Sequence, residues 1–218
     1  MKQLMTGNEA LARGAWEAGV HFASAYPGTP STEILENIST YPDIYSEWAP
    51  NEKVALEAAI GASFAGGRAL AAMKHVGLNV ATDPMFTCAY TGVNGGLMII
   101  SADDPGLHSS QDEQDNRYYS RAAKIAMLEP SDSQEAKDFV RYAMEISEKY
   151  DMPVLMRMTT RVCHSKSIVE LEEKRSDIAF VPYEKKINSI LFPQSPNGSI
   201  LRLSKTSSHW KRIPTNVL

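Results

Sequence analysis

The chain has 218 residues, of which 43% are hydrophobic, and a formal net charge of −4; this suits one large or two small globular domains and excludes nucleic acid as the main partner. Apolar runs stay below the roughly 18 residues that a membrane-spanning helix needs, and the N-terminus lacks a signal-peptide pattern. The two distant cysteines, Cys88 and Cys163, form no disulfide framework or metal-ligand cluster, so we expect a cytoplasmic protein with reduced thiols and no metal site of its own.

The first half of the chain alternates helices with apolar strands. Thr6 and Glu9 have the spacing of a capping box, which predicts a helix that ends at Gly19. The elements expected next are a strand over Val20–Tyr26, a helix over Pro30–Ile38, a short strand over Ile44–Trp48, a helix over Glu52–Ala65 and a strand over Ala69–Val76. Thr29 is expected to cap the helix that follows it, with Pro30 at the first helical position.

The alternation continues in the second half. The elements expected there are a helix over Leu78–Thr91 that Pro84 kinks or divides, a strand over Gly96–Ser101, a polar segment over Ser110–Arg121, a strand over Ala123–Leu128, a helix over Asp132–Tyr150 and a strand over Pro153–Thr159. Repeated β–α–β spacing with continuous apolar strands predicts a doubly wound α/β fold, in which helices cover both faces of a mostly parallel sheet.

Two segments offer polar groups at strand–helix junctions of this sheet. The stretch Tyr26–Glu33 passes from strand to helix, where backbone N–H groups and the helix dipole favour an anion. Glu52 stands at the start of a helix rich in Ala and Gly, which lets that helix approach another body closely. Such packing would desolvate the carboxylate and raise its pKa, as suits proton exchange with a ring nitrogen. An ordinary helix-start role stays open for both Thr29 and Glu52.

Other charged residues have two interpretations each. Lys74 and His75 are expected to end a strand and either line the same edge of the sheet or point to solvent. Arg121 precedes an apolar strand and is either a bidentate clamp for a carboxylate or a surface residue. The acidic run over residues 111–116 lacks the spacing of a calcium loop, which favours a solvated loop over a metal site.

Three motifs resemble those of the thiamine diphosphate-dependent 2-oxoacid:ferredoxin oxidoreductases, and in particular the alpha subunits of the indolepyruvate-type enzymes. They are Tyr26–Glu33, Asn51–Gly67, and Lys74–Asn79 followed by Asp83-Pro84. The resemblance covers residues 1–185 and implies the pyrimidine-binding domain of the thiamin diphosphate-binding fold. Residues 186–218 do not resemble the family's continuation, have turn residues without periodicity, and are expected to form an irregular C-terminal tail.

The resemblance also implies roles for individual residues. Thr29 would contact the substrate carboxylate, with Arg121 as a weaker match to a substrate-binding arginine. Glu52, followed at the family's spacing by Gly61, would hydrogen-bond N1′ of the cofactor and favour the tautomer that generates the reactive ylide. The remaining cofactor-binding residues implied by the resemblance are Pro27, Gly28, His75, Val76, Gly77 and Asn79.

The implied reaction is oxidative decarboxylation of an aryl 2-oxoacid to an acyl-coenzyme A, with electrons passing through [4Fe-4S] clusters to ferredoxin. The family's Gly-Asp-Gly motif for Mg²⁺ and the diphosphate is absent from this sequence, as is its cysteine-rich segment. The chain is therefore expected to be a truncated or frame-shifted alpha subunit or one component of a larger enzyme, and to be inactive alone. Its expected partners are a beta subunit, a second alpha subunit or both, in a homodimer or hetero-oligomer.

Two alternatives stay open. The chain could be a non-catalytic subunit or assembly domain of the same fold, or a relative specific for pyruvate or 2-oxoglutarate. Gly28 stands where those relatives often carry Ile, which favours room for an aryl substrate.

Overall fold

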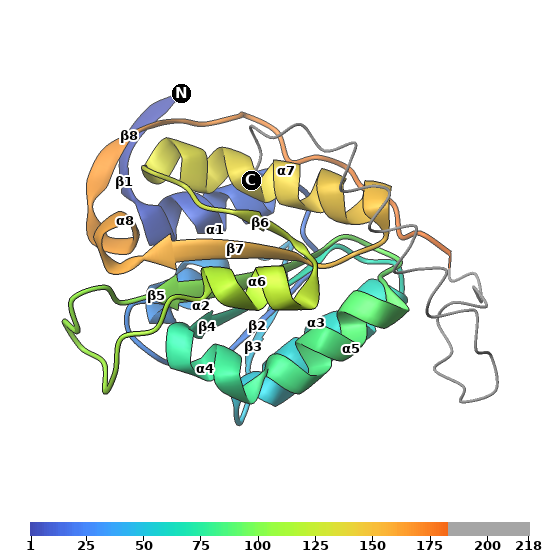
Figure 1. Ribbon diagram of the computed structural model, residues 1–218. Helices are drawn as coiled ribbons and strands as arrows, with labels where there is room; N and C mark the ends of the chain where they lie inside the picture. Colours follow the sequence, from blue (N-terminus) through green and yellow to red (C-terminus); the bar gives the residue numbers. More distant parts are fainter. Residues whose placement is uncertain (183–218) are drawn as a thin grey trace.

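A six-stranded parallel sheet between two layers of helices organises the computed structural model, which describes residues 1–182 (Figure 1). The strands are β2 (Phe22–Ala25), β3 (Tyr45–Trp48), β4 (Ala69–Lys74), β5 (Leu97–Asp103), β6 (Ala126–Leu128) and β7 (Val154–Thr159). Their order is β3-β2-β4-β5-β7-β6, and each neighbouring pair is parallel. All six carboxyl ends therefore lie along one edge of the sheet, here called the carboxyl edge, and the predicted α/β fold is confirmed.

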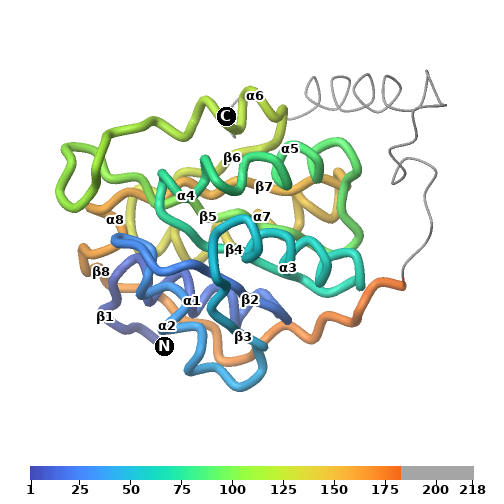
Figure 2. The backbone as a smooth tube through the Cα atoms, turned by 90° about the horizontal axis from the view of Figure 1, so that it is seen from below, coloured from blue at the N-terminus to red at the C-terminus, as the bar shows by residue number. Residues whose placement is uncertain are grey.

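Helices cover both faces of the sheet, as Figures 1 and 2 show. On one face lie α1 (Gly7–Glu17), α2 (Thr32–Ile38) and α7 (Ser133–Tyr150), and α1 packs against both of the others. On the other face lie α3 (Glu52–Phe64), α4 (His75–Val80), α5 (Thr82–Thr91) and α6 (Arg117–Ala123). The capping box of Thr6 and Glu9 is present at the start of α1, as predicted. In residues 1–182 no helix combines the length and apolar character that a membrane crossing requires.

The central strands are buried because both of their faces are covered. Every residue of β5 is buried, as is every residue of β4 except its last, Lys74. Leu70, Met73 and Ile99 are fully buried in the main hydrophobic core. Continuous apolar runs of this kind are typical of parallel strands between two helix layers. The core thus holds the strand ends in a fixed register beneath the loops of the carboxyl edge.

An antiparallel ribbon of two strands was not predicted. It consists of β1 (Lys2–Thr6) and β8 (Lys166–Glu170), the latter preceded by α8 (Thr160–His164). Its pairing partners lie near opposite ends of the described chain, and each strand is too short to show a clear alternation. Beyond it, the Ser176 N–H donates to the Glu17 carbonyl. The predicted irregular tail over residues 186–218 lies outside the described residues.

Three predicted boundaries were wrong. The strand expected to reach Val76 ends at Lys74, because His75 already begins α4. The helix expected to divide at Pro84 divides at Ala81 instead, and Pro84 lies in the first turn of α5, where its missing N–H is not needed. Helix α6 extends through Ala123, so β6 begins only at Ala126.

Candidate functional site

The predicted motifs converge at the carboxyl edge. The turn over residues 26–31 follows β2, and His75 follows the neighbouring strand β4, with which β2 is paired in parallel. Glu52 begins α3 shortly after β3, the other neighbour of β2. Ligands of parallel α/β sheets bind outside the carboxyl ends of the strands. We therefore treat this part of the edge as the candidate site.

Glu52 lies directly against Gly77. A Cβ atom at position 77 would lie 2.5 Å from Oε1 and 2.6 Å from Cγ of Glu52, so only glycine leaves room for this carboxylate. Asn51 holds the start of α3, because its Oδ1 accepts the Val54 N–H at 3.0 Å. Glu52 is half-buried, and within residues 1–182 its carboxylate has no hydrogen-bond or ion-pair partner. It is therefore an acceptor that a ligand is free to use.

Glu57, the other carboxylate of this helix, differs from Glu52. It is exposed and lies 3.9 Å from the ammonium of Lys53, one turn earlier. Lys53 also contacts Asp83 at 3.2 Å. Glu57 therefore belongs to a solvated surface cluster of charges.

The turn after β2 is built differently from the prediction. Ser31, not Thr29, precedes α2, which begins at Thr32, and the Thr29–Pro30 peptide bond is cis. The Gly28 N–H donates to Thr32 Oγ1 at 2.9 Å, while the N–H and hydroxyl of Ser31 both donate to the Gly28 carbonyl at 2.8 Å. The turn thus satisfies its own backbone groups, and the expected N-cap role of Thr29 is wrong. Tyr26, Pro27 and Thr29 are exposed at the carboxyl edge.

Lys74 connects this turn to β4. A Cβ atom at position 28 would lie 3.1 Å from the Cβ and 3.4 Å from the Cδ of Lys74, so the aliphatic part of the lysine packs over Gly28. The space that Gly28 was expected to leave for an aryl group is thus occupied by the Lys74 side chain. Its Nζ donates to the Ser109 carbonyl at 3.1 Å.

The loop between β5 and α6 closes over α4, the helix that carries the third motif. His75 is fully buried, and its Nε2 lies 3.1 Å from the Asp112 carbonyl oxygen, which requires the proton to be on Nε2. Nδ1 of His75 is then a bare acceptor without a partner in residues 1–182. Asn79 donates to Gln114 Oε1 at 2.9 Å and accepts the Tyr119 hydroxyl. Val76 is half-buried beside them.

Asp104 holds the base of the same loop. Its carboxylate accepts the Ser109 N–H at 2.7 Å, the Ser110 hydroxyl at 2.8 Å and the Thr160 hydroxyl at 2.6 Å. Burial opposes ionisation of this group, but these hydrogen bonds outweigh it and keep the pKa of Asp104 well below its usual range. The carboxylate is therefore charged throughout the neutral range and ties the loop to the core.

A network of paired charges lies at the ends of β5 and β7. Arg157 Nε donates to Asp103 Oδ2 at 2.6 Å, and both side chains are buried. Burial raises the pKa of Asp103, while the attraction of Arg157 opposes that rise. Arg157 also pairs with Glu129, which in turn binds Arg117. This network was not predicted from the sequence, although an arginine inside the apolar strand over residues 154–159 was a usable signal.

Arg121 is not part of this cluster. It lies in the last turn of α6, on the exposed side of the helix, one turn beyond Arg117. Within residues 1–182 no hydrogen bond or ion pair joins Arg121 to the residues of the carboxyl edge. Its role as a carboxylate clamp stays a prediction from resemblance.

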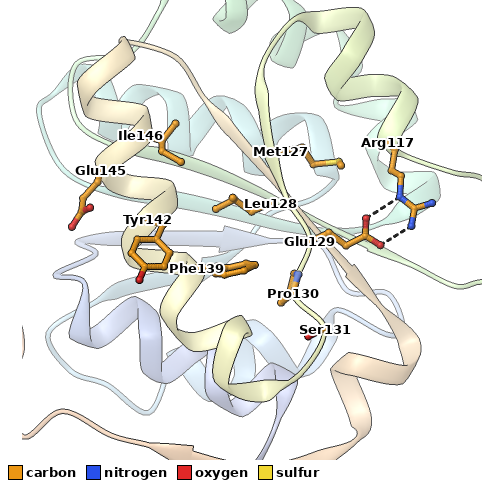
Figure 3. Close-up of a pocket in the computed structure, with 10 residues that line it drawn as sticks. All are labelled: Arg117, Met127, Leu128, Glu129, Pro130, Ser131, Phe139, Tyr142, Glu145 and Ile146. Atoms are coloured by element: carbon orange, nitrogen blue, oxygen red, sulfur yellow. Dashed lines mark hydrogen bonds and ion pairs between the residues drawn. The ribbon is translucent and has the colours of Figure 1, made fainter. Parts of the chain in front are cut away.

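A cleft of about 820 Å³ lies elsewhere, between the edge strand β6 and helix α7 (Figure 3). Phe139, Tyr142 and Ile146 of α7 face Met127 and Leu128 of β6, and the ion pair of Arg117 and Glu129 lies beside them. Strands β4, β5 and β7 separate this cleft from the turn after β2. None of the predicted site residues lines it.

These features define an α/β domain with a candidate ligand site at the carboxyl ends of its parallel strands. Residues 13–207 match the model of a family described as pyruvate flavodoxin/ferredoxin oxidoreductase, thiamine diphosphate-binding. Because the match spans most of the sequence, the chain belongs to this family.

Several relatives share the name indolepyruvate oxidoreductase subunit IorA. The subunit of Archaeoglobus fulgidus is 52% identical over 177 residues, which cover 78% of this chain and 28% of the relative. That of Pyrococcus horikoshii is 51% identical over 180 residues, which cover 81% of this chain and 28% of the relative. The 2-oxoglutarate synthase subunit KorA of Methanocaldococcus jannaschii is 31% identical, over 78% of this chain and 49% of that subunit. The chain thus spans 28% of the length of these IorA relatives.

The fold also matches a solved structure. A 2-oxoglutarate:ferredoxin oxidoreductase from Magnetococcus marinus, with 2-oxoglutarate, coenzyme A and succinyl-CoA bound, superposes with a TM-score of 0.80. The match covers 98% of this chain and 46% of the other, at 18% identity, and therefore establishes a shared fold.

Proposed function

We propose that the chain is the pyrimidine-binding part of a thiamine diphosphate-dependent 2-oxoacid:ferredoxin oxidoreductase that acts on an aryl 2-oxoacid such as indolepyruvate. The observation that carries this proposal is the unpaired, half-buried carboxylate of Glu52 against Gly77, beside the exposed turn after β2. The family match and the IorA relatives support both the reaction class and the aryl substrate. The domain comprises residues 1–185 in this proposal.

The residues at the carboxyl edge fit thiamine diphosphate. Glu52 would accept a hydrogen bond from N1′ of the pyrimidine ring and would be positioned to exchange a proton with it. Because Gly77 has no side chain, the Glu52 carboxylate can pack directly against the α4 backbone. When bound, thiamine diphosphate supplies the nucleophilic carbon and the electron sink for decarboxylation. The other residues proposed to line the cofactor are Pro27, Gly28, His75, Val76 and Asn79.

The exposed hydroxyl of Thr29 is proposed to donate to the substrate, at the end of the turn after β2. Arg121 is retained as a second candidate for the substrate carboxylate, on resemblance alone. Neither role depends on the helix cap that the sequence suggested for Thr29.

The complete enzyme requires further parts. We assign the site for Mg²⁺ and the diphosphate, and the [4Fe-4S] clusters that pass electrons to ferredoxin, to another domain or subunit. A beta subunit, a second alpha subunit or both complete the assembly, in the cytoplasm, and coenzyme A accepts the acyl group. The support is that the IorA relatives are named as subunits and are far longer than this chain. The similarity to a 2-oxoglutarate synthase subunit keeps a smaller 2-oxoacid as the alternative substrate.

Replacing Glu52 tests the proposal. In the assembled oxidoreductase, Glu52→Gln preserves size and can still hydrogen-bond but cannot accept a proton from the cofactor ring, and we expect dye reduction with indolepyruvate to fall by about 10²- to 10⁴-fold. Glu57→Gln on the same helix is the matched control and should keep the wild-type rate, because Glu57 is exposed and lies in the surface charge cluster. Equal rates for the wild type and Glu52→Gln would refute the role of Glu52.

A further inference from the structure

Lys74 places an ammonium group at the candidate site without an acidic partner. Within residues 1–182, its hydrogen-bond partner is the Ser109 carbonyl oxygen, at 3.1 Å. An ammonium has three N–H donors, and a neutral carbonyl satisfies one donor without neutralising the charge. The side chain is half-buried, where a charge interacts more strongly with an anion than it does in bulk water. The Lys74 ammonium is thus available to bind an anionic ligand.

The position of Lys74 is next to the proposed substrate turn. Its aliphatic part packs over Gly28, the residue before Thr29. Strands β2 and β4 are paired in parallel, so the turn after β2 and the end of β4 lie at the same edge. An anion held by the Thr29 hydroxyl would therefore lie at the same edge as the Lys74 ammonium.

Several other cations around the edge are already paired with carboxylates. Arg157 pairs with Asp103 and Glu129, and Arg117 pairs with Asp115 and Glu129. Lys53 pairs with Asp83 and Glu57. Arg121 is exposed on α6 and has no contact with the turn after β2 that the structure records. Lys74 is the cation that remains beside Gly28 in the described part of the chain.

We infer that Lys74 binds the carboxylate of the 2-oxoacid substrate and, with Thr29, positions it at the site. This inference rests on the proposed function and assigns to Lys74 the role that resemblance gave to Arg121. A lysine acts as a point charge on a flexible stem, so it accommodates a carboxylate without the fixed bidentate geometry of an arginine. Its charge selects for the anionic end of the substrate, whatever the aryl end is.

The test compares variants of the assembled oxidoreductase with phenylpyruvate as the probe. Steady-state dye reduction gives KM and kcat, and calorimetry with cofactor-depleted enzyme gives the Kd of phenylpyruvate without turnover. Lys74→Met keeps the aliphatic stem but removes the charge, so we expect KM and Kd to rise about 10- to 100-fold, the loss expected for a hydrogen bond to a charged group. We expect kcat to stay within about threefold, and Lys74→Arg to recover most of the affinity.

Two further variants separate this role from its alternatives. Asp104→Asn weakens the anchor of the β5–α6 loop but leaves the Lys74 ammonium, so it reports what loosening of the loop alone does. Asp104→Asn should therefore leave the Kd of phenylpyruvate within about threefold of the wild type. Arg121→Met removes the competing cation and shows which of the two cations binds the carboxylate.

The outcomes distinguish this inference from the proposed function. If the wild type binds and oxidises phenylpyruvate while Lys74→Met has an unchanged Kd, the role of Lys74 is wrong and the proposed function stands. The inference is also overturned if Asp104→Asn reproduces the loss of affinity, or if Arg121→Met shows it in place of Lys74→Met. If the wild-type assembly oxidises no 2-oxoacid, the proposed function itself fails.

Discussion

The two halves of the carboxyl edge differ in whether their charged side chains have partners of opposite charge. At β5 and β7 the charges are paired, with Arg157 bound to Asp103 and Glu129. At β2 and β4, Glu52 and Lys74 lack partners of opposite charge within residues 1–182. Polar groups inside proteins are normally satisfied, so unpaired groups at a sheet edge indicate where a ligand supplies the missing partner. The paired half is the framework, and the unpaired half is the candidate site.

The largest expected effect concerns the paired half. Arg157→Met should lower the free energy of unfolding by about 3–5 kcal/mol, because Asp103 would remain buried without its partner. Glu52→Gln should lower it by about 1 kcal/mol or less, since only a favourable helix-start charge is lost. Urea denaturation of both variants provides the measurement. Similar losses for the two would remove the distinction between framework and site.

Substitution of Gly77 tests whether the exact position of the Glu52 carboxylate matters for activity. Gly77→Ala places a Cβ where the Glu52 side chain lies and therefore displaces the Glu52 carboxylate. Because a displacement of about 1 Å in a catalytic group costs on the order of 10²-fold in rate, we expect the rate of dye reduction to fall by about that factor. Gly61→Ala on the exposed side of α3 is the control, because no atom lies within 4 Å of the added Cβ in the described structure. Rates of dye reduction by assembled enzyme would check this. A Gly77→Ala enzyme with the wild-type rate would show that the position of Glu52 does not matter.

Local signals predicted much of this fold. The capping box of Thr6 and Glu9 depends on two residues three positions apart, and it is present as predicted. Continuous apolar strands between helices were sufficient to predict the parallel sheet, and with it the shared edge for Glu52 and the motif over residues 74–79.

Features that depend on distant partners could not be predicted in the same way. The pairing of β1 with β8 joins segments far apart in the sequence. The contact of Lys74 with Gly28 exists only because β2 and β4 are neighbours. Thr29 was the cap expected from the sequence, but α2 begins only at Thr32, after a turn in which Ser31 donates to the Gly28 carbonyl. Arg157 was conspicuous in an apolar strand, but its partner Asp103 required the strand order.

The most direct test of the central claim locates the cofactor on the molecule. Backbone amide hydrogen exchange of the assembled enzyme, with and without thiamine diphosphate and Mg²⁺, reports which segments the ligand protects. The account predicts protection of residues 26–32, 51–54 and 75–80, and unchanged exchange around the cleft lined by Phe139 and Tyr142. Protection confined to β6 and α7, with unchanged exchange at Glu52 and its neighbours, would contradict it.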